Sequence, residues 1–160
     1  MNLRKSFHWS TALLALITGI SLDSLAVLVP DPALEQIIRD RLGKPAGAIT
    51  REEMATLTSI SAFNHGITDL EGIQYAINLT TLDLRDNPTT NHIPISALHK
   101  LQHLILINQG LRQIDFVADL QQLNRLDLFA NQITNAAPVE NLPLLEHLSL
   151  SEIPLAPCPC

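Results

Sequence analysis

The sequence is poor in aromatic and charged residues, and it has no long run of basic residues. Aromatic residues make up 4% and charged residues 16% of the chain, whereas apolar residues make up 46%. So large an apolar share argues against general disorder. The net charge is −6 and the longest basic run is Arg4-Lys5. Nucleic acid requires a positive patch, so we predict no nucleic-acid partner.

Cysteine is equally scarce. The two cysteines, Cys158 and Cys160, flank Pro159 at the C-terminus. A one-residue loop would strain a mutual disulfide, and a metal site needs more ligands than this segment offers. We interpret residues 154–160 as an unstructured Pro/Cys tail or a truncation scar, with disulfide pairing to another chain as the alternative. No metal and no cofactor are expected.

The N-terminus is typical of an exported protein. Arg4 and Lys5 precede the apolar or small stretch 11–22, and Ser24-Leu25-Ala26 offers small residues to a signal peptidase. We predict a signal peptide over residues 1–26, and a secreted or cell-envelope protein in the periplasm or at the cell surface. The alternative is an uncleaved signal anchor, because residues 10–30 carry a single charge, Asp23. Membrane contact is expected only through such an uncleaved segment.

A 22-residue period dominates the rest of the chain. The frame L-x-x-L-x-L occurs five times over residues 57–153, with its first position at Leu57, Leu79, Leu101, Leu123 and Leu145. Alternate residues of a strand share one face, so each repeat forms one short strand with leucines on one side. A single such strand cannot bury its apolar face, but a parallel stack can.

The predicted fold class is therefore α/β: a right-handed leucine-rich repeat solenoid with a curved parallel sheet. Its convex side should be extended or 3₁₀, since so short a repeat leaves no room for a full helix. Three residues after the last strand leucine, an Asn amide can bind the turn backbone. This position holds His65, Asn87, Gln109, Asn131 and Ile153. The second repeat should have an irregular turn, because Pro88 follows and Thr89 replaces an aliphatic residue.

Residues 27–56 have a helical pattern. Asp31 before Pro32 is typical of a helix start, and Gly43 of its end. Thr50 and Glu53 form the pattern of a capping box for a second short helix. We predict an α-helical N-terminal cap that covers the end of the leucine core.

Specific segments resemble the internalin-type leucine-rich repeat domains of bacterial surface proteins. They are Pro30-Asp31-Pro32-Ala33-Leu34, Leu57-Thr58-Ser59-Ile60, residues 66–76 and Leu79-Thr80-Thr81-Leu82-Asp83-Leu84. The resemblance implies a helical cap, a curved parallel sheet and binding through the concave face. Family members usually have more repeats, then an immunoglobulin-like cap and a wall anchor, whereas this chain has five strands and neither of these.

The strand residues that point away from the core define what we call the sheet face: positions 59, 61 and 63 and their equivalents in the other four repeats. Large apolar groups on a solvated face suggest a contact patch. The alternatives are scattered surface hydrophobes and, for the charged residues, cross-strand ion pairs. The candidate binding residues are Phe63, Asp83, Arg85, His103, Ile105, Ile107, Arg125, Asp127, Phe129 and His147.

The pattern favours a binding protein over an enzyme. No nucleophile has a base at a recognisable spacing, and there is no Gly-rich phosphate loop. A zinc site at His103, Asp127 and His147 is disfavoured, because Arg125 lies between the histidines and repels a cation. We therefore predict an exported module that binds a protein partner through the concave sheet face, without catalysis.

Two other readings remain open. One is a truncated or degenerate repeat fragment of a larger surface protein, with self-association through an uncapped C-terminal end. The other is an intracellular regulatory scaffold that retains its N-terminus.

Overall fold

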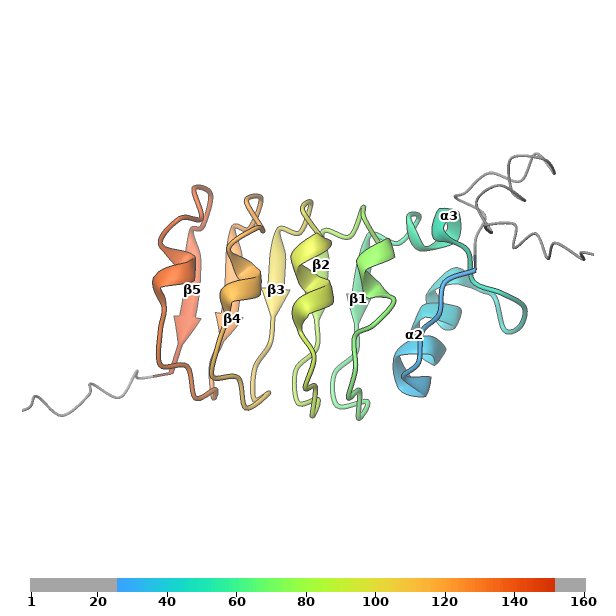
Figure 1. Cartoon of the computed structure of the whole chain (residues 1–160), viewed down its shortest axis with the longest axis horizontal. Helices are drawn as coiled ribbons and strands as arrows, with labels where there is room; N and C mark the ends of the chain where they lie inside the picture. Colours follow the sequence, from blue (N-terminus) through green and yellow to red (C-terminus); the bar gives the residue numbers. More distant parts are fainter. Residues whose placement is uncertain (1–25, 152–160) are drawn as a thin grey trace, which may run out of the picture.

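The computed structural model describes residues 26–151, which form a row of stacked repeats (Figure 1). Five parallel strands lie side by side in sequence order: β1 (Ser59–Ser61), β2 (Thr81–Asp83), β3 (His103–Ile105), β4 (Arg125–Leu128) and β5 (His147–Leu150). Paired residues are one repeat apart, as in Ile60 with Leu82 and Leu82 with Leu104. The predicted leucine-rich repeat solenoid is confirmed.

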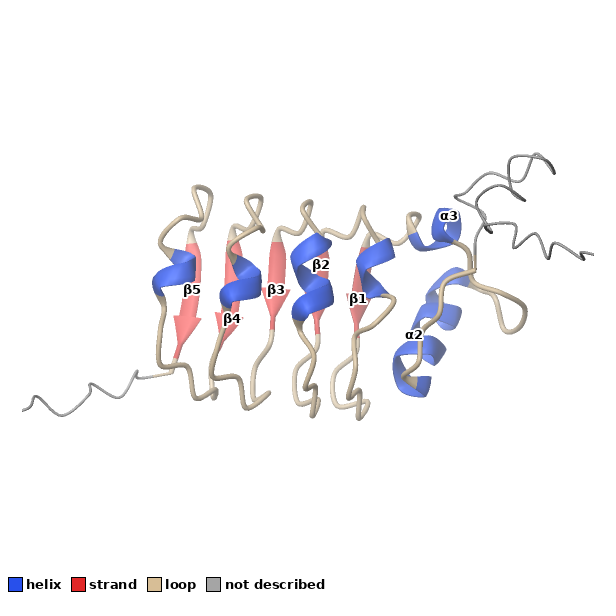
Figure 2. Ribbon diagram, viewed as in Figure 1, coloured by secondary structure: helices blue, strands red, loops and turns tan. Residues whose placement is uncertain are grey.

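The chain returns from each strand on the opposite side of the molecule through a short 3₁₀ helix. These helices form a layer beside the strands (Figure 2): η2 (Ile73–Tyr75), η3 (Ile93–Ala97), η4 (Asp115–Val117) and η5 (Ala137–Val139). A 3₁₀ turn rises more per residue than an α-helix and so spans the return with few residues. The expected 3₁₀ returns are confirmed.

The leucines of the repeat frame fill the space between the two layers. Leu82, Leu104 and Leu126 are fully buried, and they belong to one continuous core cluster. At β5 no further described repeat packs on the core, and Leu148 is 42% exposed. The apolar surface that each repeat buries is thus supplied by its neighbours, and the last described repeat lacks one of them.

Buried asparagines hold the turns after the strands. The Asn87 amide donates to the carbonyls of Ala62 and Leu84 at 2.6 and 2.8 Å, and its Oδ1 accepts from the backbone of the preceding turn. Asn131 makes the equivalent bonds to Leu106 and Leu128 at 2.7 and 2.8 Å. The role predicted for these two asparagines is present in the structure.

Two helices precede the sheet: α2 (Pro32–Leu42) and α3 (Arg51–Met54). Asp31 caps α2 through Oδ1, while its Oδ2 accepts from the backbone of Thr68 and Asp69 at 2.8 and 3.2 Å. Burial alone would raise the pKa of Asp31, but these hydrogen bonds outweigh burial and hold it below its ordinary value. One carboxylate therefore joins α2 to the first repeat.

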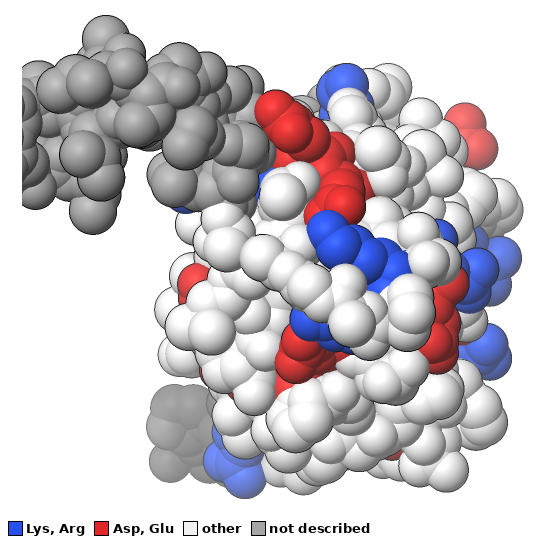
Figure 3. Space-filling model, turned by 90° about the vertical axis from the view of Figure 1, so that its right-hand side faces the viewer, with Lys and Arg blue, Asp and Glu red and all other residues white. Residues whose placement is uncertain are grey.

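The helical end carries intermixed charges, as Figure 3 shows. They include the pair of Lys44 with Glu53 and that of Arg39 with Glu35, each at 2.7 Å. The side chain of Met54 lies beneath them in the core. The helices thus place charge over the end of the solenoid, while their role as a cap stays a prediction.

Some sequence predictions fall outside the described residues. These are the signal peptide, apart from Ala26, and the tail with Cys158 and Cys160. Between residues 26 and 151, no helix combines the length and apolarity that a membrane crossing demands.

Candidate binding surface

The sheet face brings the predicted residues together in straight rows across the strands. His103, Arg125 and His147 are direct neighbours in one row. Another row contains Phe63, Arg85, Ile107 and Phe129, whose repeats are joined by backbone hydrogen bonds in the turns. In these bonds the N–H of Asn64 donates to the carbonyl of Arg85, that of Asp86 to Ile107 and that of Asn108 to Phe129, at 2.9–3.1 Å. Positions remote in sequence therefore form one surface on a hydrogen-bonded backbone.

The aromatic side chains are the most exposed apolar groups on this surface. Phe63 is 53% and Phe129 56% exposed, while Ile105 and Ile107 are partly exposed. The guanidinium of Arg85 lies 5.5 Å from the centre of the Phe63 ring, within the range of a cation–π contact. Arg85 therefore shields one face of Phe63 only, and no described residue makes such a contact with Phe129.

The charged residues pair along the strands, so the cross-strand alternative is wrong. Arg85 donates to both carboxylate oxygens of Asp83, with a shortest distance of 2.7 Å. Arg125 lies 3.9 Å from Asp127. The reason is the register, which places the uncharged Ser61 and Ile105 directly opposite Asp83.

These ion pairs are asymmetric in their exposure. The side chains of Asp83 and Asp127 are 10% and 15% exposed, whereas those of Arg85 and Arg125 are 44% and 53% exposed. Asp127 also accepts a hydrogen bond from the Phe129 backbone at 3.3 Å. The carboxylates thus lie against the sheet and the guanidinium groups extend into solvent.

The histidines of the sheet face do not form a metal site with Asp127. Arg125 lies between His103 and His147 in the strand register, as the sequence predicted. Across residues 26–151, the structure has no group of three or more His, Cys, Asp or Glu side chains suited to a metal ion.

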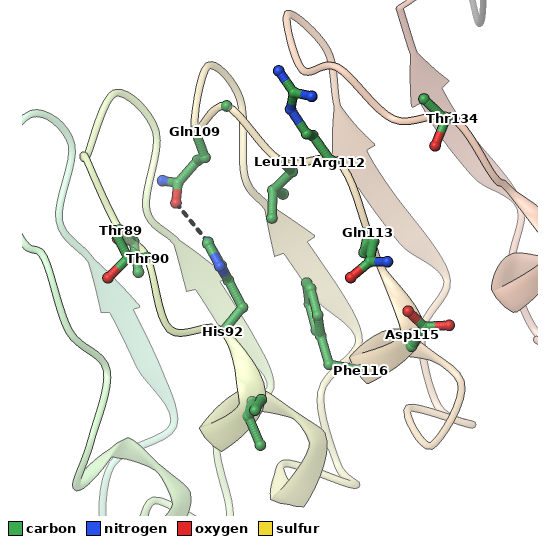
Figure 4. A pocket seen from close by; sticks show the side chains of 12 residues that line it. Thr89, Thr90, His92, Gln109, Leu111, Arg112, Gln113, Asp115, Phe116 and Thr134 are labelled. Carbon is green, nitrogen blue, oxygen red and sulfur yellow. Dashed lines mark hydrogen bonds between the residues drawn. The ribbon is translucent and has the colours of Figure 1, made fainter.

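Sequence reasoning missed a buried histidine on another side of the solenoid. His92 is 8% exposed, and its Nε2 lies 3.0 Å from Oε1 of Gln109 (Figure 4). Its ring stacks on Phe116 with 5.5 Å between the ring centres. These residues line an open groove of about 890 Å³ that also includes Arg112 and Asp115. Burial lowers the pKa of His92, and the hydrogen bond to Gln109 only partly opposes this.

The missed histidine had a sequence signal. His92 lies one repeat after Leu70 and one repeat before Ile114, both of which are buried. A polar residue therefore occupies an aliphatic position of the repeat. Gln109 occupies the position of Asn87 and Asn131, and the extra methylene lets its amide oxygen reach His92. His92 and Gln109, which both depart from the repeat pattern, are therefore hydrogen-bond partners.

A second missed feature is the left-handed residue that follows each of the strands β1 to β4. Asn64, Asp86, Asn108 and Ala130 have φ between 55° and 58° and occupy equivalent positions of successive repeats. Asn and Asp tolerate this conformation better than other residues with a Cβ. Their recurrence in the sequence was the available signal, and Ala130 departs from it.

The stacked parallel strands, the buried leucine frame and the asparagine-bonded turns define a leucine-rich repeat protein. No protein-family model matches the chain. Internalin H of Listeria monocytogenes is 39% identical over 69 residues, which are 42% of this chain and 13% of internalin H. The structure of internalin C2 from the same species matches with a TM-score of 0.67 and 34% identity, covering 76% of this chain and 65% of that one.

A third relative is InlJ, also from Listeria monocytogenes. Its functional domain matches with a TM-score of 0.69 and 27% identity, over 79% of this chain and 30% of that one. The chain therefore spans less than two thirds of the length of these relatives. Together with the fold, these matches all point to an internalin-type leucine-rich repeat protein.

Proposed function

We propose that this chain is an exported module that binds a protein partner through its sheet face, without catalysis. The observation that carries the proposal is the exposure of Phe63 and Phe129, by 53% and 56%, on one row of a hydrogen-bonded sheet. Exposed aromatic side chains supply a large share of the binding energy when a partner covers them.

The geometry favours association for a second reason. The side chains of the sheet face project from a backbone that is fixed by pairing on both sides of β2, β3 and β4. Little conformational entropy is then lost when a partner binds, which leaves more of the contact energy for affinity. The internalin-type relationship supports the same interpretation, since that resemblance implies binding through the concave face.

The test is an affinity capture from host or culture extracts with the purified chain as bait. The variant Ile105→Asp with Phe129→Ala should lose its captured proteins. The matched control is Ile77→Ala with Ile93→Ala, which truncates two exposed apolar side chains outside the sheet face (53% and 75% exposed). If both variants and the parent capture the same proteins, the sheet face is not the binding site.

Export has its own test, the mass of the chain isolated from its natural source. Cleavage after Ala26 leaves Val27 as the new N-terminus, and its nitrogen already donates to the Ile49 carbonyl at 2.7 Å. An ammonium group can make the same bond, so cleavage is compatible with the packing of this segment. A full-length mass would instead favour the signal anchor or the intracellular scaffold.

The exposed apolar end at β5 favours a second candidate, self-association or continuation into further repeats. Leu144 and Leu148 are 49% and 42% exposed there, and β5 has no described strand on its outer side. Such an edge offers unpaired backbone groups to another strand. Sedimentation of the purified chain distinguishes a monomer from an edge-paired assembly.

A further inference from the structure

The net formal charge of the sheet face does not describe which charged groups are exposed to a partner. Its fifteen positions hold two arginines and two aspartates, which sum to zero. The side chains of Asp83 and Asp127 are nonetheless 10% and 15% exposed, whereas those of Arg85 and Arg125 are 44% and 53% exposed. An approaching group therefore meets guanidinium first.

The positive groups flank the apolar ones. Arg85 lies between the repeats of Phe63 and Ile107, and Arg125 lies one strand beyond Ile105. A shallow groove of about 480 Å³ over β2–β5 adds His103 and His147 to Arg125, and Glu146 is its only acidic lining residue among those the structure describes. Arginine and aromatic side chains are both enriched in protein interfaces relative to the rest of the protein surface.

This arrangement selects for carboxylate groups. A guanidinium binds a carboxylate through two parallel hydrogen bonds, a geometry that fits Asp and Glu side chains. A nucleic acid is disfavoured, because its dense phosphate charge would meet a chain of net charge −6. A short acidic segment that contacts only the sheet face avoids most repulsion from the acidic remainder of the chain. The reason is that charges more than about 8 Å away are screened at physiological salt.

We propose that the partner of the sheet face is an acidic protein segment with an apolar anchor. Its carboxylates bind Arg85 and Arg125, and its apolar side chain packs on Phe129 and Ile107. This inference rests on the proposed function, because it specifies the chemistry of the partner that the same surface binds.

The test uses a yeast-displayed random peptide library selected on the full chain. Peptides that bind the sheet face are identified by their loss of binding to Phe63→Ala with Phe129→Ala. We expect these peptides to be enriched in Asp and Glu around an apolar residue. Raising the salt concentration should weaken their binding, since the contacts are charged.

Two variants of the Asp83–Arg85 ion pair should then change the affinity for the selected peptides in opposite directions. Asp83→Asn removes the carboxylate that holds Arg85, so acidic peptides should bind several-fold more tightly. Asp83→Asn with Arg85→Gln removes the guanidinium without leaving a carboxylate unpaired, and should weaken binding about tenfold, the effect of losing one charge-assisted contact. The control is Arg41→Gln, which removes a guanidinium from the exposed surface of α2 outside the sheet face and should leave the affinity for these peptides unchanged.

The outcomes separate this inference from the proposed function. Selected peptides that depend on Phe63 and Phe129 but are neutral or basic, and indifferent to Arg85, overturn the acidic partner alone. Peptides indifferent to all of these residues overturn the proposed function as well. Circular dichroism of each variant shows whether the fold is retained, and Asp83→Asn remains informative if the double variant unfolds.

Discussion

Replacing His92 by leucine tests whether the buried histidine and Gln109 act as one unit. In the parent, Nε2 of His92 lies 3.0 Å from Oε1 of Gln109, and the Gln109 amide donates to the Leu84 carbonyl. That donation fixes the amide, so its oxygen accepts a hydrogen bond from the imidazole. His92→Leu leaves this oxygen buried and unpaired, at a cost of about 1–3 kcal/mol. Leucine returns about 1 kcal/mol through its additional apolar surface.

We therefore expect His92→Leu to lower the free energy of unfolding by about 1 kcal/mol, the balance of these two effects. Gln109→Asn in the same chain should reverse the loss, because the shorter amide can bind the turn as Asn87 and Asn131 do. The double variant should equal or exceed the parent, with a coupling energy of about 1–2 kcal/mol. Urea unfolding of the four proteins, followed by circular dichroism, measures this cycle.

The dependence on pH gives an independent measure of the same site. Burial lowers the pKa of His92 in the folded state, so the unfolded chain binds more protons near neutral pH. The parent should lose stability as pH falls below the ordinary histidine pKa of about 6.5, and the loss should level off below the folded-state pKa. His92→Leu should make this loss of stability smaller, because the contribution of His92 to it is removed. The buried pair would be refuted if the effects of the two substitutions on the free energy of unfolding were additive. It would also be refuted if the stability of parent and His92→Leu changed with pH in the same way.

Four further substitutions test three separate features. Asp31→Ala should lower the free energy of unfolding by about 2–3 kcal/mol, through the lost cap and charged hydrogen bonds. Because the pKa of Asp31 is lowered in the fold, the difference from the parent should be present above pH ~4 and shrink as acid protonates the carboxylate; a difference constant with pH would contradict this. Ala130→Asn should stabilise by about 0.5–1 kcal/mol by relieving a left-handed alanine, and Asn64→Ala should cost a similar amount, both measured by urea unfolding. Leu148→Lys should shift sedimentation towards monomer; unchanged assembly would exclude the β5 end as the interface.

The repeat and its core were predictable because burial follows the sequence period directly. Each strand buries its alternate residues, so Leu82 and Leu104 had to face one core once the repeat spacing was recognised. The same alternation placed Phe63 and Phe129 on the sheet face. What a period specifies is the side of the sheet on which a residue lies.

A period does not specify which partner a polar group takes. The direct neighbours of Asp83 across the sheet are uncharged, so its ion pair with Arg85 runs along the strand, and the sequence left this open. The burial of His92 was also missed, because a histidine at an aliphatic position is stable only when Gln109 reaches it from the next repeat. Such pairings depend on side-chain length and rotamer.

The polar substitutions at aliphatic positions of the second and third repeats leave the sheet face intact for a structural reason. In a solenoid each repeat contacts only its neighbours, so a polar residue in the core must be compensated by the adjoining repeat. His92 and Gln109 achieve this in the turns between the second and third repeats. On the sheet side, Leu84 still donates to Ile105 at 3.0 Å and Asp86 to Ile107 at 3.1 Å. Variation among the turns can therefore accumulate while the rows of the sheet face keep their spacing. This separation lets the stability of the solenoid and the composition of its sheet face change independently.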